Sequence, residues 1–184
     1  GFLVSFLRIN AFMVTLGMFA LARGAAISIS EGDAIPVREE ALLILGRGSL
    51  GPVPWSVIVT VAAAAVFAFL LRRTVLGRWT LAAGGNERAA VASGIPTRST
   101  VWLSFAFLGV LVGISAILVI GRSGSAQPMA GLGMEFSAIT AAVIGGASLA
   151  GGKGSVISTL LGSVFVGVLT SGLSFAGVEQ ALIY

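Results

Sequence analysis

Long apolar runs alternate along this chain with short polar segments. Four of the runs approach the roughly 20 helical residues needed to cross the ~30 Å hydrocarbon core of a bilayer. They span residues 11–29, 55–71, 101–120 and 156–176. A fifth run, residues 137–150, is too short to cross upright and is expected to form a short or re-entrant helix. The pattern predicts an all-α fold, a polytopic transmembrane helix bundle with four full spans and one shorter helix.

The composition agrees with a protein whose main solvent is lipid. Of the 184 residues, 57% are hydrophobic and only 10% are charged, with a mean hydropathy of +1.05. Soluble domains carry about 25% charged residues. Glycines such as Gly162, Gly167 and Gly172 in the last run suit close packing of membrane helices. One membrane domain over residues 1–184 is the simplest organisation.

The residue inventory argues against catalysis and metal binding. Cysteine and histidine are absent from the sequence, which excludes disulfides and the common zinc sites. The apolar runs hold no pair of acids, and no serine or threonine has a candidate base beside it. The chain is therefore expected not to be an enzyme and to hold no metal.

Charges in the polar segments predict how the spans are oriented. Residues 72–100 hold five arginines and one acid, whereas residues 30–54 hold four acids and two arginines. Because cytoplasmic loops are enriched in basic residues, residues 72–100 are expected in the cytoplasm and residues 30–54 outside. Alternation then places Arg8 and Lys153 inside and residues 121–136 outside. The basic residues are scattered rather than gathered in a stripe, so the net charge of +4 does not indicate nucleic-acid binding.

One glycine pattern resembles a dinucleotide-binding motif. The stretch Gly46-Arg-Gly-Ser-Leu-Gly51 matches G-x-G-x-x-G, which functions between a strand and a helix. Pro52 and Pro54 follow at once, and no βαβ unit surrounds it. We interpret it as part of an external loop.

A second glycine pattern resembles a phosphate-binding P-loop. In the stretch from Ala147 to Gly154, alanine stands where the motif needs glycine, and glycine stands where serine or threonine would hold magnesium. The chain is therefore not expected to hydrolyse ATP. The structural interpretation is a tight glycine turn between two membrane segments, with Lys153 at the cytoplasmic interface.

Arg23 is a charge within the first span, where an arginine at a helix centre costs roughly 2.5–3.5 kcal/mol. It either lines an aqueous path or pairs with an acid such as Glu31, or it anchors the helix at the interface by snorkelling.

The predicted cytoplasmic segment contains signals for a short helix. Gly84 and Gly85 end one element, and Asn86 can cap a helix over residues 87–92, with Glu87 favourable in its first turn. Gly94 and Pro96 would end it. Such a helix could dock a partner or could simply connect two spans; the residues alone leave both interpretations open.

Three stretches together resemble the permease subunits of ribose-type ABC importers, within the branched-chain amino acid and sugar permease family. One runs Ala11-Phe-Met-Val-Thr-Leu-Gly-Met-Phe-Ala-Leu-Ala-Arg-Gly24, and another runs from Leu76-Gly-Arg78 through Gly84-Gly-Asn-Glu-Arg-Ala-Ala to Ser93-Gly-Ile95. The third joins Ser125-Ala-Gln-Pro128 to Ser148-Leu-Ala-Gly-Gly-Lys-Gly154. The resemblance covers nearly the whole chain. Members are nearly twice as long, and the first residues lack signal-peptide features, so the chain is expected to be a fragment.

The resemblance implies a multi-pass protein of the bacterial plasma (inner) membrane that imports a monosaccharide by alternating access. Its partners would be a cytoplasmic ATP-binding subunit holding ATP and Mg, a periplasmic or lipid-anchored sugar-binding protein on residues 30–54 and 121–136, and a second permease copy. ATPase coupling would fall to residues in the loop 72–100: Gly85, Asn86, Glu87, Arg88, Ala89, Ala90, Ser93 and Gly94. The cytoplasmic glycine turn would comprise Gly145, Gly146, Gly151, Gly152 and Lys153.

Small and polar side chains are expected to line the substrate path, with Thr15, Ser104, Ser115 and Gln127 as candidates. The alternatives are a branched-chain amino acid ABC permease and an ATP-independent secondary carrier or channel. The spans contain no acid of the kind that carriers use to bind protons or sodium, which weighs against ion coupling. A membrane scaffold without transport is a third class.

Overall fold

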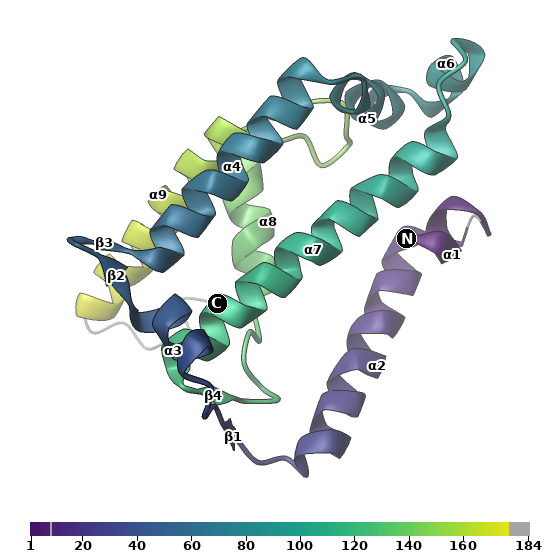
Figure 1. The fold of residues 1–184 in the computed structure, drawn as a ribbon. Coiled ribbons are helices and arrows are strands. Elements are labelled where there is room, and N and C mark those ends of the chain that lie inside the picture. Colours follow the sequence, from purple (N-terminus) through teal and green to yellow (C-terminus); the bar gives the residue numbers. More distant parts are fainter. Residues whose placement is uncertain (8, 177–184) are drawn as a thin grey trace. The chain divides into compact units, whose positions relative to one another are not determined.

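The computed structural model describes residues 1–7 and 9–176, and the prediction for Arg8 lies outside them (Figure 1). Contacts divide the chain into two compact units, each described by itself. Unit 1 comprises residues 1–63 and 98–130, and unit 2 comprises residues 64–97 and 131–184. Whether the chain acts as a single membrane domain stays a prediction.

Unit 1 contains the elements of the first part of the chain and the body of one long helix. The helices are α1 (Phe2–Ser5), α2 (Ala11–Ser30), α3 (Glu40–Arg47) and α7 (Thr97–Ser123), together with the first half of α4 (Trp55–Arg73). The strands are two-residue pieces. The strand β1 (Ile35–Pro36) pairs antiparallel with β4 (Ser125–Ala126), and β2 (Ser49–Leu50) pairs with β3 (Val53–Pro54).

The part of unit 2 that the structure describes contains four helices besides the second half of α4. They are α5 (Val75–Gly85), α6 (Glu87–Ala92), α8 (Met134–Ile144) and α9 (Val156–Phe175). The helices α5 and α6 contact each other, and α8 and α9 lie side by side (Figure 1).

Within residues 1–7 and 9–176, four helices are long and apolar enough to cross a membrane, and α8 is a shorter apolar helix. The prediction of an all-α polytopic protein with four spans and one short helix is therefore confirmed. The 27 residues of α7 extend about 40 Å at ~1.5 Å per residue, which exceeds the hydrocarbon core. Arg98 and Arg122 therefore lie near the two ends of α7, where each can reach the interface.

Several predicted boundaries differ from the structure. The short run predicted over residues 137–150 forms a helix over Met134–Ile144, because Gly146 takes a left-handed φ of +83° just after the helix end. Residues 30–54 were expected to be a loop, yet they contain α3 and the β2–β3 hairpin. Gly51, at φ +63° in the turn of that hairpin, supplies a conformation that side chains disfavour.

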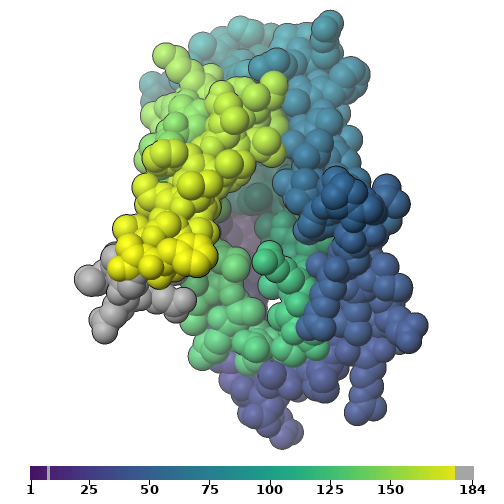
Figure 2. Space-filling model, turned by 90° about the vertical axis from the view of Figure 1, so that its left-hand side faces the viewer, coloured from purple at the N-terminus to yellow at the C-terminus, as the bar shows by residue number. Residues whose placement is uncertain are grey.

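Side chains follow the expectation for a lipid solvent. Among the described residues, the buried hydrophobic residues are Ala90 and Ala141, and large apolar side chains are exposed along the spans. Figure 2 shows α9 (yellow) on the surface, where Leu161, Val164 and Phe165 are more than half exposed. Lipid or further spans of the same protein can cover such side chains at no cost in hydration.

Candidate functional site

The candidate site is the α5–α6 segment (residues 75–95) together with the glycine turn (residues 145–154), both within unit 2. The segment begins where the chain leaves α4. The Thr74 hydroxyl donates to the Leu70 carbonyl at 2.6 Å and accepts from the Gly77 N–H at 3.4 Å, so it closes α4 and caps α5. A Cβ at Gly77 would collide with the Leu71 carbonyl, which makes glycine necessary in this sharp turn.

Asn86 joins α5 to α6. Its backbone N–H donates to the Ala82 carbonyl at 3.1 Å, at the end of α5. Its side-chain Oδ1 accepts from the Ala89 N–H at 3.0 Å, at the start of α6. Asn86 thus pairs a backbone carbonyl at the end of α5 and a backbone N–H at the start of α6. The structure contains both the predicted cap and the predicted helix, Glu87–Ala92.

The end of α6 is equally well defined. Gly94 adopts φ +78°, its N–H donates to the Val91 carbonyl at 3.0 Å, and the Ile95 N–H donates to the Ala90 carbonyl at 3.0 Å. This pair of bonds is a Schellman motif, which pairs carbonyls that a helix end would otherwise leave unsatisfied. The six-residue helix is therefore fixed at both ends by its own sequence.

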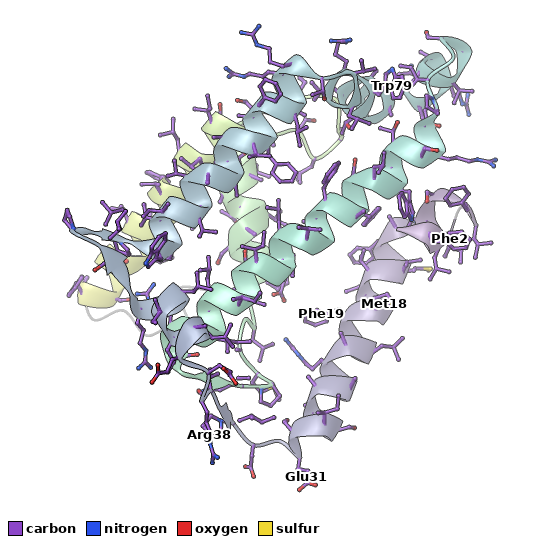
Figure 3. All side chains as sticks on the ribbon, in the orientation of Figure 1. Phe2, Met18, Phe19, Glu31, Arg38 and Trp79 are labelled. Atoms are coloured by element: carbon purple, nitrogen blue, oxygen red, sulfur yellow. The ribbon has the colours of Figure 1, made fainter. Side chains whose placement is uncertain are left out.

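The predicted coupling residues fall into two classes by exposure. Ala90 is 4% exposed, so it packs inside the segment and is not available to a partner. The other predicted residues are exposed: Gly85, Asn86, Glu87, Arg88, Ala89, Ser93 and Gly94. Val91 is 55% exposed, and the predicted coupling residues did not include it, although a large apolar residue on a short helix in a polar loop is a signal for a contact. Trp79 of α5, labelled in Figure 3, is half-buried.

The glycine turn connects α8 to α9. The Ser148 N–H donates to the Lys153 carbonyl and the Gly151 N–H donates to the Ser148 carbonyl, both at 3.0 Å. Gly146, Gly151 and Gly152 have φ values of +83°, +89° and +75°, a left-handed conformation that glycine adopts without strain. These residues form a turn rather than the strand–loop–helix arrangement of a P-loop.

The structure brings the two predicted glycine motifs into direct backbone contact. A Cβ added at Gly84 would lie 2.8 Å from the Gly152 nitrogen, and one at Gly152 would lie 2.5 Å from the Gly85 Cα. A Cβ at Gly151 would collide with the Gly84 carbonyl oxygen. Loops in contact lie on one side of a membrane, in agreement with the loop charges that place residues 72–100 and Lys153 on the same side.

A second pair of segments is joined in the same way within unit 1. A Cβ at Gly46 of α3 would collide with the backbone of Gly121 in α7, and both glycines are buried. Arg47 donates from Nε to the Arg122 carbonyl at 2.9 Å and from Nη2 to the Ser123 carbonyl at 3.0 Å, which caps the end of α7. With the β1–β4 pairing, these bonds join residues 30–54 to residues 121–136, both predicted to be external.

The α3–α7 contact also explains the dinucleotide-like pattern. Gly46 allows the close approach to Gly121, Gly48 follows the end of α3, and Gly51 makes the hairpin turn. Sequence reasoning missed α3. The acidic Glu40 in its first turn and Arg47 in its last turn were the signals that could have revealed it.

The four predicted path residues lie in unit 1, two of them on α7, one on α2 and one after β4. Ser104 and Ser115 are on α7, eleven residues apart, so they share one face about 16 Å apart along the axis. The Ser104 hydroxyl donates to the Thr100 carbonyl at 3.0 Å, and the Thr15 hydroxyl of α2 donates to the Phe12 carbonyl at 3.1 Å. Gln127 is exposed after β4, where its backbone carbonyl accepts from the Ala130 N–H. Their role in a path stays a prediction.

Arg23 lies over an aromatic ring of its own helix. The guanidinium carbon is 4.4 Å from the centroid of Phe19, a cation–π geometry. Figure 3 labels Phe19 on α2 and Glu31 at the end of that helix, where Glu31 adopts φ +54° as the C-cap. The contact with Phe19 gives the charge a local partner one turn away, which suits the interpretation of an anchor.

The family model and the relatives that match this chain are all described as permeases or permease components. A family model described as "Branched-chain amino acid transport system / permease component" matches residues 1–184. The ribose import permease protein of Escherichia coli (strain K12) is 38% identical over 186 residues, covering 98% of this chain and 57% of the relative. The L-arabinose transport system permease protein of the same strain is 35% identical over 179 residues, covering 97% and 55%.

A third relative, the D-allose transport system permease protein of that strain, is 34% identical over 179 residues, covering 97% of this chain and 55% of the relative. The chain thus spans about half the length of the curated relatives it matches. No solved structure matches it significantly.

Proposed function

Since this chain belongs to the family of branched-chain amino acid transport system permease components, we propose that it is the membrane-spanning part of a permease subunit that imports a monosaccharide in an ABC system. The family and the four spans confirm a multi-pass protein of the bacterial inner membrane. The similarity to permeases of the sugar branch of the family, predicted from the motifs, is also confirmed. The energy would come from ATP and Mg bound by a separate cytoplasmic subunit.

The α5–α6 segment is the proposed docking site for that ATPase subunit. The observation that carries this proposal is a six-residue helix, fixed at both ends by Asn86 and Gly94, with the Glu87, Arg88 and Val91 side chains exposed. A preformed helix loses little conformational entropy when it docks. Less of the favourable contact free energy is therefore offset by the cost of ordering the segment. The positive loop charge supports a cytoplasmic position for the segment, where the ATPase would be.

The relatives' names support the proposed substrate class. Those described above are permeases for ribose, L-arabinose and D-allose, which are all monosaccharides. The family description instead names branched-chain amino acids, which is the observation that favours the second candidate. We favour a monosaccharide because the identities of 34–38% extend over nearly the whole chain.

Two further partners complete the proposal. A periplasmic or lipid-anchored sugar-binding protein would dock on residues 30–54 and 121–136, which the α3–α7 contact joins into one surface. A second permease copy would complete the path, to which Thr15, Ser104, Ser115 and Gln127 contribute. In this scheme the two copies alternate between outward and inward access as the ATPase acts.

Substrate class is tested by uptake in the organism that encodes the full-length protein. Deleting its gene should abolish uptake of one radiolabelled monosaccharide, with L-arabinose, D-ribose and D-allose as probes and L-leucine as control. Restoring the gene should restore uptake. Loss of leucine uptake with the three sugars unchanged would favour the amino-acid permease.

ATPase docking is tested with surface variants of the full-length permease. Val91→Trp and Glu87→Lys should each weaken co-purification of the ATPase by about tenfold or more, as central contact residues do. Val75→Trp is the matched control, since Val75 is 45% exposed but lies at the opposite end of α5. If the ATPase does not co-purify with the unmodified permease, the ATP-independent carrier or channel becomes the better account.

A further inference from the structure

Beyond docking, the α5–α6 segment is connected by backbone contacts to a second membrane element. Asn86 ends α5 and begins α6, so the two helices share a residue and its hydrogen bonds at 3.0 and 3.1 Å. No flexible linker separates α6 from the Gly84–Gly85 pair at the end of α5. A displacement of α6 therefore reaches these glycines directly.

The next connection is the contact of Gly84 and Gly85 with Gly151 and Gly152. Here backbone meets backbone, with the hypothetical Cβ of Gly84 only 2.8 Å from the Gly152 nitrogen. Side chains can change rotamer to absorb a small displacement, whereas two backbones in contact have no such freedom. We name these four residues the glycine clamp.

The glycine turn is in turn held by the α8–α9 hairpin (residues 134–175). A Cβ at Gly145 would lie 2.5 Å from the Ser158 carbonyl oxygen and 2.7 Å from the Thr159 Cα. A Cβ at Gly162 would collide with the Ala141 carbonyl oxygen. These close backbone contacts join α8 to α9 next to the turn, so we expect the hairpin to follow a displacement of the turn.

We propose that the glycine clamp transmits the movement of α6 to the α8–α9 hairpin, so that the hairpin changes position when the ATPase acts. This inference rests on the proposed function, and it assigns Gly84 and Gly151 a positioning role. It adds a second route for that movement besides the covalent connections of the segment to α4 and α7. The clamp and the hairpin both lie in unit 2.

The first test compares two glycines of the full-length permease with its ATPase, one in the clamp and one outside it. In Gly84→Ala the added methyl must displace the turn, whereas in Gly109→Ala of α7 a Cβ has nothing within 4 Å. Neither glycine has a positive φ, so alanine is compatible with both backbones. We expect the sugar transported per ATP hydrolysed to fall about tenfold in Gly84→Ala, a usual size for coupling between sites, and to be unchanged in Gly109→Ala.

The second test approaches the clamp from the turn. Gly151→Ala and Gly146→Ala carry the same backbone strain, with φ +89° and +83°, but only the methyl at position 151 meets the α5 carbonyl, while position 146 has nothing within 4 Å. A loss of coupling in Gly151→Ala alone supports the clamp. An equal loss in both variants would attribute the effect to strain and overturn the clamp.

Co-purification of the ATPase separates the two proposals. The clamp predicts that Gly84→Ala and Gly151→Ala retain the ATPase and its basal hydrolysis while transport per ATP falls. If the ATPase binds and both variants couple like the unmodified protein, the clamp is wrong and docking stands. If the unmodified permease binds no ATPase, the proposed function itself fails.

Discussion

The helix α2 and the α8–α9 hairpin use similar sequences in different ways. Both α2 and α9 are apolar helices of 20 residues that contain glycines. Gly17 and Gly24 of α2 have nothing within 4 Å of a hypothetical Cβ, and α2 has no buried residue. Gly162 of α9, in contrast, abuts the Ala141 carbonyl. Glycine in a membrane helix therefore permits close packing, but the close contact forms only where a second helix lies at the same depth in the membrane.

The same contrast occurs within α9. The sequence predicted close packing at Gly162, Gly167 and Gly172, and among the described residues only Gly162 has that contact. Gly167 and Gly172 have open space around them, because α8 has only 11 residues and reaches only the first part of α9. Close packing at Gly167 and Gly172 stays a prediction, since the described residues place no partner against them.

The largest expected effect is at the hairpin. Gly162→Ala inserts a methyl against the Ala141 carbonyl, and such overpacking typically costs about 1–3 kcal/mol. Gly167→Ala is the control on the same helix, where open space predicts no loss. The measurement is thermal unfolding of the purified full-length protein in detergent. Equal unfolding midpoints for Gly162→Ala and Gly167→Ala would show that α8 and α9 can move apart to admit the methyl without loss of stability.

A smaller effect is expected at the start of α2. The Asn10 side chain accepts from the Phe12 N–H at 2.9 Å, and loss of such a cap typically costs about 1 kcal/mol. Asn10→Ala should lower the unfolding midpoint, whereas Asn10→Ser keeps an acceptor and should restore most of it. If Asn10→Ala unfolds like the unmodified protein, contacts outside residues 1–184 fix the start of α2.

The smallest effect is expected within α2. Gly17→Ala fills open space, so the free energy of unfolding should change by less than about 0.5 kcal/mol. The same unfolding measurement applies, with Gly162→Ala as the sensitive reference. A loss as large as that of Gly162→Ala would mean that another span of the full-length protein packs on Gly17, which would remove the contrast between the two regions.

Features governed by local chemistry could be predicted from the sequence. The spans follow from hydropathy, and α6 follows from Asn86, Gly94 and Pro96, with bounds that agree residue for residue. The end of α8 was missed because hydropathy stays high past Ile144, while the helix stops at the glycine pair 145–146. A glycine pair at this position is itself a sequence signal for the end of a helix.

Contacts between distant segments could not be predicted in the same way. Nothing in the residues near Gly84 identifies Gly151 as their neighbour, and Arg47 gives no sign that its acceptors are the carbonyls of residues 122 and 123. Glycine and arginine have many possible partners, so one sequence leaves the pairing undetermined. The exposure of individual side chains in α6 could not be predicted either. Ala89 and Ala90 are neighbours of the same residue type, yet Ala89 is exposed and Ala90 is buried.

The bond from Arg47 to α7 also has a consequence for the order of events during synthesis. Arg47 and its acceptor Arg122 are 75 residues apart. At about 5–20 residues per second, a ribosome needs roughly 4–15 s to make the intervening chain. For those seconds α3 is without its partner on the side that the loop charges predict to be external. The α3–α7 contact can therefore form only after the third span has been delivered, and a pause in translation between the two residues would leave α3 open to proteases for longer.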